Sequence, residues 1–399
     1  MEKRYSAIIV GAGPAGCSAA VTLARMGYDI LVLDRARFPR DKTCGDGLGA
    51  GTLTLLDRLG MMPALKALRP WRIDGIFLSA PDGKKVLAPI PRVSGYRNYG
   101  YVLPRKALDF MLWEQIQQYD NVETLEGCQV TDLIREGDTI QGVEARTGSE
   151  TRKFHSHFII AADGCHSIIA RSLGLLNQDK RHHAFAVRAY FDGVEDLSSI
   201  IEIHYEETIL PGYGWIFPTG ENSANVGVGI MNRIADQKDI KKLFDLFLSK
   251  NRFARKKLSH ATMREGSLKG WPLANGSFPG KRGQGNVLLA GDAGSFIDPM
   301  SGEGIYYALK SGELAASTVH CGLAEMTRHK TVAEIYEQLW RQKFLWHDFR
   351  PAYLLQNLLT KKAIINYAIR RAKASPANAK TLAGAISHIY PKGRLLWNL

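Results

Sequence analysis

Apolar residues along the chain occur either in short runs, as in β-strands, or at helical spacing, and the changes between these two patterns mark the boundaries of the expected elements. A short apolar run from Ser6 to Val10 ends in a glycine turn, a helix of small residues continues to about Met26, and a second apolar run spans Ile30 to Leu33. This order of strand, turn, helix and strand is typical of the opening of a doubly wound α/β domain. We therefore expect residues 1 to about 50 to begin a parallel sheet.

The remaining apolar positions separate into a region of short, broken runs and a region of long helices. Short runs interrupted by Gly, Pro and aromatic residues occur at Gly75 to Leu78, at Ala184 to Phe191 and across Ile200 to Ile230. This pattern is typical of an antiparallel sheet. Beyond Gly304 almost the whole chain has helical spacing.

No repeat or low-complexity linker separates these patterns, so we predict two folding units that interleave along the chain. The predicted fold class is α/β: a Rossmann-type domain that is interleaved with an antiparallel β-sheet domain and followed by a C-terminal helical region. We assign residues 1–75, 101–175 and 281–325 to the Rossmann-type domain. The sheet domain, which would bind substrate, takes residues 76–100 and 176–280, and the helical region takes residues 326–399.

A dinucleotide-binding fingerprint follows the first predicted strand. Gly11 permits a tight turn, Gly13 lets backbone amides approach a pyrophosphate, and Gly16 lets the helix pack close to the strand. The helix N-terminus offers unpaired N–H groups and a positive dipole to phosphates. Asp34 ends the second strand, eighteen residues past Gly16, where a carboxylate accepts hydrogen bonds from a ribose. The predicted dinucleotide site consists of Gly11, Gly13, Pro14, Ala15, Gly16, Asp34 and Arg35.

Two later segments repeat the design of a buried strand followed by a turn with an aspartate. Phe158 to Ala162 runs into Asp163, and Val287 to Ala290 runs into the turn Gly291 to Asp292. Both turns are expected at the same edge of the sheet, beside the dinucleotide. For Asp163 a purely structural role in its turn stays open. The helix that begins near Gly304 can direct its N-terminus at an anionic part of the ligand.

These ordered motifs resemble the flavoprotein group that contains aromatic hydroxylases, flavin halogenases and geranylgeranyl reductases, over roughly residues 5 to 325. The resemblance implies that the dinucleotide is FAD. It also implies that Asp292 meets the ribityl and phosphate part of FAD and that Arg105 approaches the cofactor, with an arginine opening an exposed helix as the alternative. The residues implied to line the isoalloxazine are Gly302, Gly304 and Ile305.

Two further segments are similar to the geranylgeranyl reductase branch of this group. Lys42 to Gly45 matches its Lys-x-Cys-Gly loop, and Tyr213 to Pro218 matches its Tyr-x-Trp-x-Phe-Pro motif. The three aromatic residues of the second motif alternate along a strand, so their rings face one side and form an apolar wall for an isoprenoid substrate. Ordinary sheet core is the alternative interpretation. The implied substrate contacts are Tyr213, Trp215 and Phe217.

The branch implies hydride transfer from reduced FAD to an isoprenoid C=C bond. Cys44 and Gly45 are then expected beside the flavin, since glycine lets the backbone approach the ring and a thiol is small and soft. Cys44 and Tyr213 are the candidate catalytic residues, as proton donors or, for Cys44, as a flavin-side contact. A buried, inert thiol is the alternative for Cys44.

Three questions stay open at this point. Monooxygenation or halogenation of an aromatic or apolar small molecule is the rival activity; Trp215 and Pro218 match part of a halogenase motif, but Tyr213 stands where that motif has a second tryptophan. An electron-transfer flavoprotein that reduces a quinone is a further class, which the absence of clustered cysteines disfavours. No second G-x-G-x-x-G motif occurs, so the electron donor is NADPH bound transiently or a ferredoxin.

Composition and charge change this picture mainly at the C-terminus. Five scattered cysteines without a C-x-x-C pair favour a reducing, cytoplasmic setting and predict no metal site. The net charge is +13, and from Met326 onward thirteen basic residues stand against three acidic ones. These basic helices either contact the anionic inner face of a membrane or form a lid with a solvated basic face. Nucleic-acid binding has no supporting motif.

Overall fold

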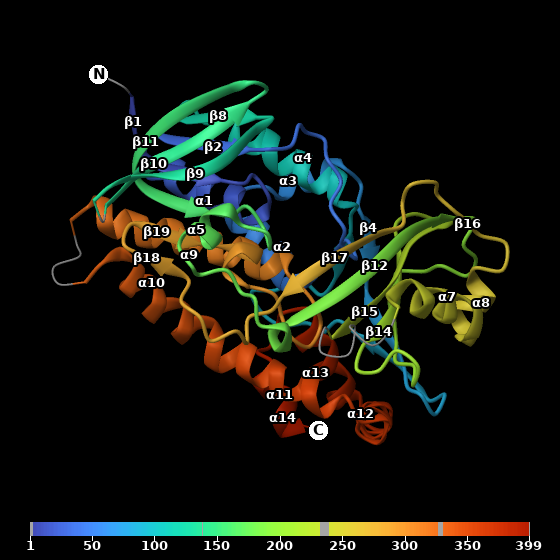
Figure 1. Cartoon of the computed structure of the whole chain (residues 1–399). Coiled ribbons are helices and arrows are strands. Elements are labelled where there is room, and N and C mark those ends of the chain that lie inside the picture. The colour runs from blue at the N-terminus through green and yellow to red at the C-terminus, as the bar shows by residue number, and fades with distance from the viewer. Residues whose placement is uncertain (1–2, 138, 232–238, 326–329, 399) are drawn as a thin grey trace.

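A parallel sheet is built around the N-terminal strand (Figure 1). The structure, a computed structural model, describes residues 3–137, 139–231, 239–325 and 330–398. The parallel strands lie in the order β19 (Val287–Leu289), β11 (Glu150–Ala161), β1 (Arg4–Val10), β2 (Ile30–Asp34) and β8 (Val122–Glu126). Since β2 and β11 flank β1 on opposite sides, the carboxyl end of β1 is a switch point of the topology, where α/β sheets bind ligands. The predicted Rossmann-type arrangement is confirmed.

Different elements cover the two faces of this sheet because side chains alternate along β1. Ala7 and Ile9 share a core with α1 (Pro14–Arg25) and α9 (Ile305–Leu323), whereas Ile8 and Val10 share a core with an antiparallel extension. That extension consists of β9 (Cys128–Glu136), β10 (Thr139–Thr147) and the first part of β11, with α5 (Ile168–Ser172) packed on it. A short strand, β18 (Gly283–Gln284), closes the other edge beside β19.

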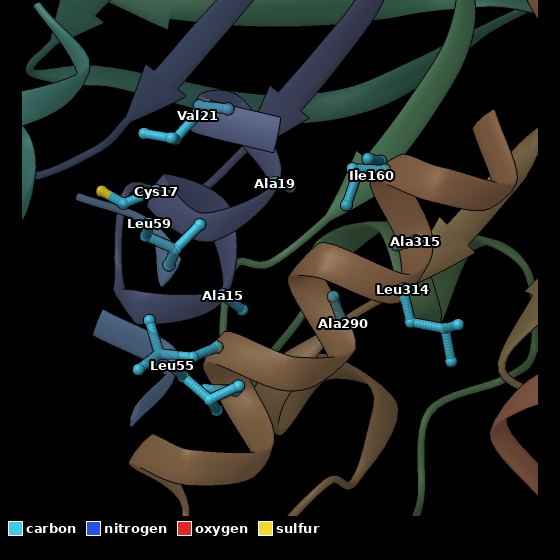
Figure 2. Packing of buried hydrophobic residues seen from close by; sticks show 14 of the residues in the cluster. Ala15, Cys17, Ala19, Val21, Leu55, Leu59, Ile160, Ala290, Leu314 and Ala315 are labelled. Atoms are coloured by element: carbon cyan, nitrogen blue, oxygen red, sulfur yellow. The ribbon is translucent and has the colours of Figure 1, made fainter. Parts of the chain in front are cut away.

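The helices α1 and α9 pack closely because both carry small residues where they meet. A Cβ atom on Gly312 of α9 would lie 2.1 Å from the carbonyl oxygen of Ala15 in α1. At Gly16 a Cβ atom would lie 1.8 Å from the carbonyl oxygen of Gly11, so this glycine brings the helix against the turn, as the fingerprint predicts. Figure 2 shows the small side chains of α1 in the same core as Leu314 and Ala315 of α9.

A second sheet of eight strands faces the carboxyl end of the first. Its strands lie in the order β16, β12, β15, β14, β13, β5 and β6, and β17 also pairs with β12. All pairs are antiparallel, as predicted, except β5 and β13, which run parallel and come from distant segments of the chain rather than from one hairpin. The strands are β5 (Gly75–Ser79), β6 (Lys85–Pro89), β12 (His183–Asp192), β13 (Ile200–His204), β14 (Tyr213–Pro218), β15 (Ser223–Met231), β16 (Thr262–Met263) and β17 (Lys269–Ala274).

The chain passes between the two sheets more than once. Strands at residues 75–89 and 183–274 belong to the second sheet, and those at residues 4–34, 122–161 and 283–289 belong to the first. The domain boundaries given above stay a prediction. The connecting elements are α2 (Ala50–Arg58), α3 (Met62–Ala67), α4 (Arg105–Ile116), η1 (Lys180–His182), η2 (Gly291–Gly294) and a small sheet of β3 (Gly47–Leu48), β7 (Gly100–Val102) and β4 (Trp71–Ile73).

Helices cover the second sheet and close the bottom of the view in Figure 1. One apolar core joins α7 (Ile240–Lys250) and α8 (Arg252–Lys257) to β12, β14 and β15, and another joins α12 (Lys362–Ala374) and α13 (Pro376–Ile386) to β5 and β6. The described part of the C-terminal region is helical, as predicted. Its other helices are α10 (Val332–Trp340), the π-helix η3 (Arg341–Phe349), α11 (Arg350–Leu358) and α14 (Gly393–Asn398). Within the described ranges, each helix is too short or too polar to cross a membrane.

We predict that Gly312→Ala lowers the free energy of unfolding by roughly 1–3 kcal/mol, because the added methyl group forces α9 away from the Ala15 carbonyl. Urea unfolding followed by circular dichroism measures this. Ser317→Ala, on the same helix, is the control and should change stability by less than about 0.5 kcal/mol. Equal unfolding midpoints for the two variants would contradict the close packing.

Candidate functional site

Two adjoining cavities lie where the carboxyl end of β1 meets the second sheet. The turn cavity is lined by the glycine turn, the ends of β1 and β2 and the Asp163 turn. The aromatic cavity is lined by the Lys42–Gly49 segment, by the Tyr213, Trp215 and Phe217 face of β14 and by residues from Asp292 to Ala308. The two cavities share seven lining residues, including Lys42 and Arg105. A ligand that extends through both would therefore reach from the first sheet to the second.

The turn cavity brings the predicted fingerprint residues together. Gly11, whose φ is +100°, adopts a backbone conformation that glycine favours, and it shapes the turn after β1. The helix that follows has Gly13 as its N-cap without a side-chain cap, and its first residue is proline. Its first-turn N–H groups are therefore available to phosphate oxygens. The fingerprint residues that line the cavity are Gly11, Gly13, Pro14, Ala15, Asp34 and Arg35, while Gly16 packs behind them.

The two predicted aspartates of the turn cavity differ in their free hydrogen-bonding capacity. Asp34 accepts backbone N–H groups on both oxygens, from Ala12 and from Ala36, each at 2.8 Å. These bonds fix the carboxylate, and a carboxylate oxygen has a second lone pair for a sugar hydroxyl. Asp163 accepts the Ile168 N–H on Oδ2 at 2.9 Å, and its buried Oδ1 has no partner among the described residues. Asp163 thus holds its turn and keeps one oxygen for a ligand.

The aromatic cavity confirms the predicted alternation along β14. Tyr213, Trp215 and Phe217 all line it, with ring centroids 6.1 Å and 6.3 Å apart along the row. A Cβ atom on Gly45 would lie 3.1 Å from the Phe217 ring, so the cysteine loop packs directly against this aromatic face. The wall is therefore a site surface as well as sheet core, and its contact with substrate stays a prediction.

The segment from Pro39 to Leu48, here called the cysteine loop, is tied to both sheets. Three consecutive residues of the loop form ion pairs with different elements. The pairs are Arg40 with Asp109 of α4 at 2.6 Å, Asp41 with Arg188 of β12 at 2.8 Å and with Lys269 of β17 at 2.7 Å, and Lys42 with Asp292 of η2 at 2.7 Å. Asp292, predicted as a cofactor contact, therefore borders both cavities with a lysine partner.

Asp46 anchors the other end of the cysteine loop. Its side chain is fully buried and its φ is +66°. The carboxylate accepts hydrogen bonds from the Tyr190 hydroxyl at 2.6 Å, the Asn225 amide at 2.7 Å and the Arg105 backbone N–H at 3.1 Å. Burial raises the pKa of Asp46 to about 6, although these donors favour the ionised form. The loop conformation thus depends on a carboxylate that is held by donors from three elements.

Asn225 of β15 joins the loop to the aromatic wall. Its amide nitrogen donates to the Cys44 carbonyl and to Asp46 Oδ2, both at 2.7 Å, and its oxygen accepts from Trp215 Nε1 at 2.9 Å. The side chain is fully buried, so each of these bonds would be costly to lose. One amide therefore sets the position of the Cys44 backbone relative to the Trp215 ring.

Arg105 does not open an exposed helix, and that alternative is wrong. The side chain is buried and forms a bidentate ion pair with Asp109, with N–O distances of 2.6 Å and 2.7 Å. Burial disfavours the charge on Asp109, but Arg105 and Arg40 outweigh it and keep the pKa of this carboxyl below its ordinary value. Arg105 lines both cavities, and its approach to a cofactor stays a prediction.

The two candidate catalytic residues both lie in the aromatic cavity. The Cys44 sulfur accepts the Asp46 backbone N–H at 3.3 Å, and burial raises the pKa of the thiol. The Tyr213 hydroxyl donates to the Ser301 carbonyl, and burial holds the pKa of this phenol far above its ordinary value. Both groups are therefore neutral and weakly acidic.

Gly302 and Gly304, which precede α9, and Ile305, its first residue, line the aromatic cavity, and their contact with an isoalloxazine stays a prediction. Gly302 has a φ of +69°, and a Cβ atom there would lie 3.7 Å from the Tyr213 hydroxyl. Glu303, between the two glycines, accepts the Tyr306 N–H on its carboxyl oxygens at 3.0 Å and 3.1 Å. A carboxyl group of the chain itself therefore accepts a hydrogen bond from the first turn of α9.

The residues of the turn cavity fit the diphosphate and sugar of FAD. An uncapped helix N-terminus, the fixed carboxylate of Asp34 and the free buried oxygen of Asp163 supply donors and acceptors of the required kinds. The basic side chains of Arg40 and Lys42 line the same cavity and add positive charge near phosphate. The adjoining aromatic cavity offers the flat, apolar surroundings that a flavin ring needs.

Three residues that organise the site, Asp46, Asn225 and Glu303, were not predicted from the sequence. Asp46 and Glu303 lie inside motifs that were interpreted from their glycines and their cysteine, so the two acidic residues were not considered. Asn225 lies within a buried strand, where asparagine is unfavourable, and this mismatch was the available signal. The partners that fix these side chains come from distant segments, so the sequence alone does not indicate them.

We predict that Asn225→Ala lowers the free energy of unfolding by about 1–3 kcal/mol and also weakens FAD retention, because it frees the cysteine loop from the aromatic wall. Asn286→Ala is the matched control: its amide donates to two backbone carbonyls, Ile140 and His157, away from both cavities. The control should lose stability but retain FAD. Flavin absorbance per protein after gel filtration distinguishes them, and equal retention would refute this role of Asn225.

Comparisons with known proteins agree with this geometry. The chain matches the FAD binding domain family over residues 4–329. The menaquinone reductase of Mycolicibacterium smegmatis is 32% identical over 338 residues, which cover 81% of this chain and 78% of the relative. The digeranylgeranylglycerophospholipid reductase of Methanosarcina acetivorans is 30% identical over 366 residues, which cover 90% and 85% of the two chains.

Solved structures share the fold. A geranylgeranyl bacteriochlorophyll reductase-like protein from Thermoplasma acidophilum is 21% identical, with a TM-score of 0.83 and 100% of both chains covered. A flavin-dependent brominase is 18% identical, with a TM-score of 0.78 and 96% and 94% covered. Proteins named for the rival activity and for reduction thus share this fold, whereas the two sequence relatives above are both reductases. The chain belongs to the FAD-binding domain family and, within it, to the geranylgeranyl reductase group of FAD-dependent oxidoreductases.

Proposed function

We propose that the enzyme reduces isoprenoid C=C bonds of a geranylgeranyl or polyprenyl-type lipid. The main observation that supports this proposal is that a cavity suited to FAD adjoins an apolar cavity lined by aromatic side chains. The relatives named menaquinone reductase and digeranylgeranylglycerophospholipid reductase support it, because both named lipids carry isoprenoid chains. An isoprenoid chain has no polar group along its length, so an apolar wall is the surface that binds it.

The residues of the chain bind and orient the two ligands in this proposal. When bound, reduced FAD supplies the hydride. The glycine turn and the first turn of α1 hold the diphosphate, Asp34 holds the sugar, and Asp292 with Lys42 holds the middle of the cofactor. Arg105, Asp163, Gly291, Gly302, Gly304 and Ile305 complete the cofactor contacts.

Two residues of the aromatic cavity are assigned to the reacting centre. Cys44 lies in the loop that packs against the aromatic wall, and we assign it the contact beside the flavin. Tyr213 donates its hydroxyl to the Ser301 carbonyl, which fixes its ring as a surface for the substrate chain. An isolated alkene develops no oxyanion, so the contribution of the protein is positioning and the exclusion of water.

The C-terminal helices support a peripheral contact with a membrane, from which a lipid substrate would enter. The exposed side of η3 and α11 presents Trp346, Leu354 and Leu358, with 56%, 51% and 38% of their surfaces exposed. Arg350 stacks on Trp346 at 3.9 Å and adds positive charge to this apolar strip. Gln356 and Leu359 of the same segment line the aromatic cavity. An anionic lipid surface complements both the apolar strip and the basic charge.

We expect the purified protein to be yellow and, under anaerobic conditions with a reductant, to saturate double bonds of a geranylgeranyl lipid. NADPH and reduced ferredoxin are tested as separate donors. Mass spectrometry should detect a gain of two hydrogens per reduced bond, without oxygen. Incorporation of an oxygen atom or a halide in aerated solution, with no saturation, would favour the rival monooxygenase or halogenase activity instead.

We expect the double variant Trp346→Glu with Leu354→Glu to lose binding to phosphatidylglycerol vesicles in a flotation assay, because two charged side chains replace the apolar strip. Met26→Glu, a substitution of an exposed apolar residue at the end of α1, should leave flotation unchanged. Flotation of the double variant at the level of the control would rule out this contact surface.

A further inference from the structure

Four carboxyl groups of the chain border the aromatic cavity, those of Asp46, Asp292, Asp298 and Glu303, and they differ in their partners. Asp292 and Asp298 each form an ion pair with a lysine, Lys42 and Lys392 respectively. Asp46 accepts three hydrogen bonds, from Tyr190, Asn225 and Arg105, which hold it in place as an anchor of the cysteine loop. The Glu303 carboxyl is bound by backbone N–H groups at the start of α9, those of Tyr306 and Ile305, and by no side chain of the described structure. Its carboxyl therefore has lone pairs and a proton position that are free for a ligand.

The loop that carries Glu303 is firmly held, so the carboxyl has a fixed position. Asp298 accepts the backbone N–H groups of Met300 and Ser301 at 2.8 Å and 2.7 Å and forms a buried ion pair with Lys392 at 3.4 Å. The Glu303 backbone carbonyl accepts the Asp298 N–H at 2.9 Å. A group that transfers a proton to carbon must be held close to that carbon, and this loop provides such support.

We propose that Glu303 is the catalytic acid of the reaction. This role rests on the proposed function. The Glu303 carboxyl O–H bond breaks, and its proton forms a C–H bond with one carbon of the substrate C=C bond. The other carbon receives the hydride from reduced FAD, which is oxidised to FAD while the alkene is reduced to the alkane. The Glu303 carboxylate then regains a proton from water.

The charges around Glu303 favour this role over the other donors in the cavity. Burial, with the nearby Asp298 carboxylate, raises the pKa of Glu303 to about 7, although the Tyr306 and Ile305 N–H groups and the Lys392 ammonium lower it. Burial also raises the pKa of the two other candidate donors, Cys44 and Tyr213. Asp46 of the cysteine loop has a pKa of about 6, but its carboxylate is already occupied by the donors Tyr190, Asn225 and Arg105. Near neutral pH, Glu303 is therefore both partly protonated and the strongest acid of the three candidate donors.

Glu303→Gln tests the proposal because it keeps the shape of the side chain and removes the acid. Turnover with reduced FAD and a geranylgeranyl lipid should fall by about 10²–10⁴-fold, while FAD content stays that of the wild type. In the wild type, turnover should be constant at low pH and decrease as pH rises through about 7, since the protonated form is required. Glu303→Asp, which keeps the acid on a shorter side chain, should restore part of the activity.

An infrared titration provides a readout that does not depend on turnover. The C=O stretch of a protonated carboxylic acid should disappear from the FAD-loaded wild type with a midpoint near pH 7, and this change should be missing in Glu303→Gln. Lipid reduction by Glu303→Gln at the wild-type rate, or a titration unchanged by the substitution, would overturn the role of Glu303 alone. Failure of the wild type to reduce any isoprenoid bond, with FAD bound, would overturn the proposed function and the acid role together.

Discussion

The position of the cysteine loop depends on ion pairs that reach in three directions. Arg40 binds α4 of the first sheet, Asp41 binds two strands of the second sheet, and Lys42 binds the turn after β19. The loop lines both cavities, so these contacts determine the shape of each cavity and the way in which the two adjoin. A cofactor that extended from the turn cavity into the aromatic cavity could react with a substrate beside it only if this arrangement were constant.

The site uses buried charges that would be costly if they were not paired. Arg188 is fully buried, but its guanidinium reaches Asp41, and Asp109 is fully buried between Arg105 and Arg40. Such pairs contribute little net stability compared with apolar packing, yet breaking one member leaves an uncompensated charge. These pairs instead favour one relative position of the two sheets, because only in that position does each of these charges have its partner.

Much of the first sheet could be predicted from the sequence because its signals are local. The turn after β1, the helix of small residues and the acid at the end of β2 are consecutive, and the structure has them as expected. The alternation of Tyr213, Trp215 and Phe217 was similarly local and correct. The parallel pairing of β5 with β13, the buried state of Arg105 and the contacts of Asn225 depend on residues far apart in the chain. Periodicity contains no information on such partners.

The ion pair between Lys392 and Asp298 couples the C-terminal helical region to the loop before α9. Both side chains are fully buried, and Lys392 lies between α13 and α14, far along the chain from its partner. Local detachment of the C-terminal helices would leave each of these buried charges without its partner, and such an opening is energetically costly. The two distant parts of the chain therefore unfold cooperatively rather than one after the other.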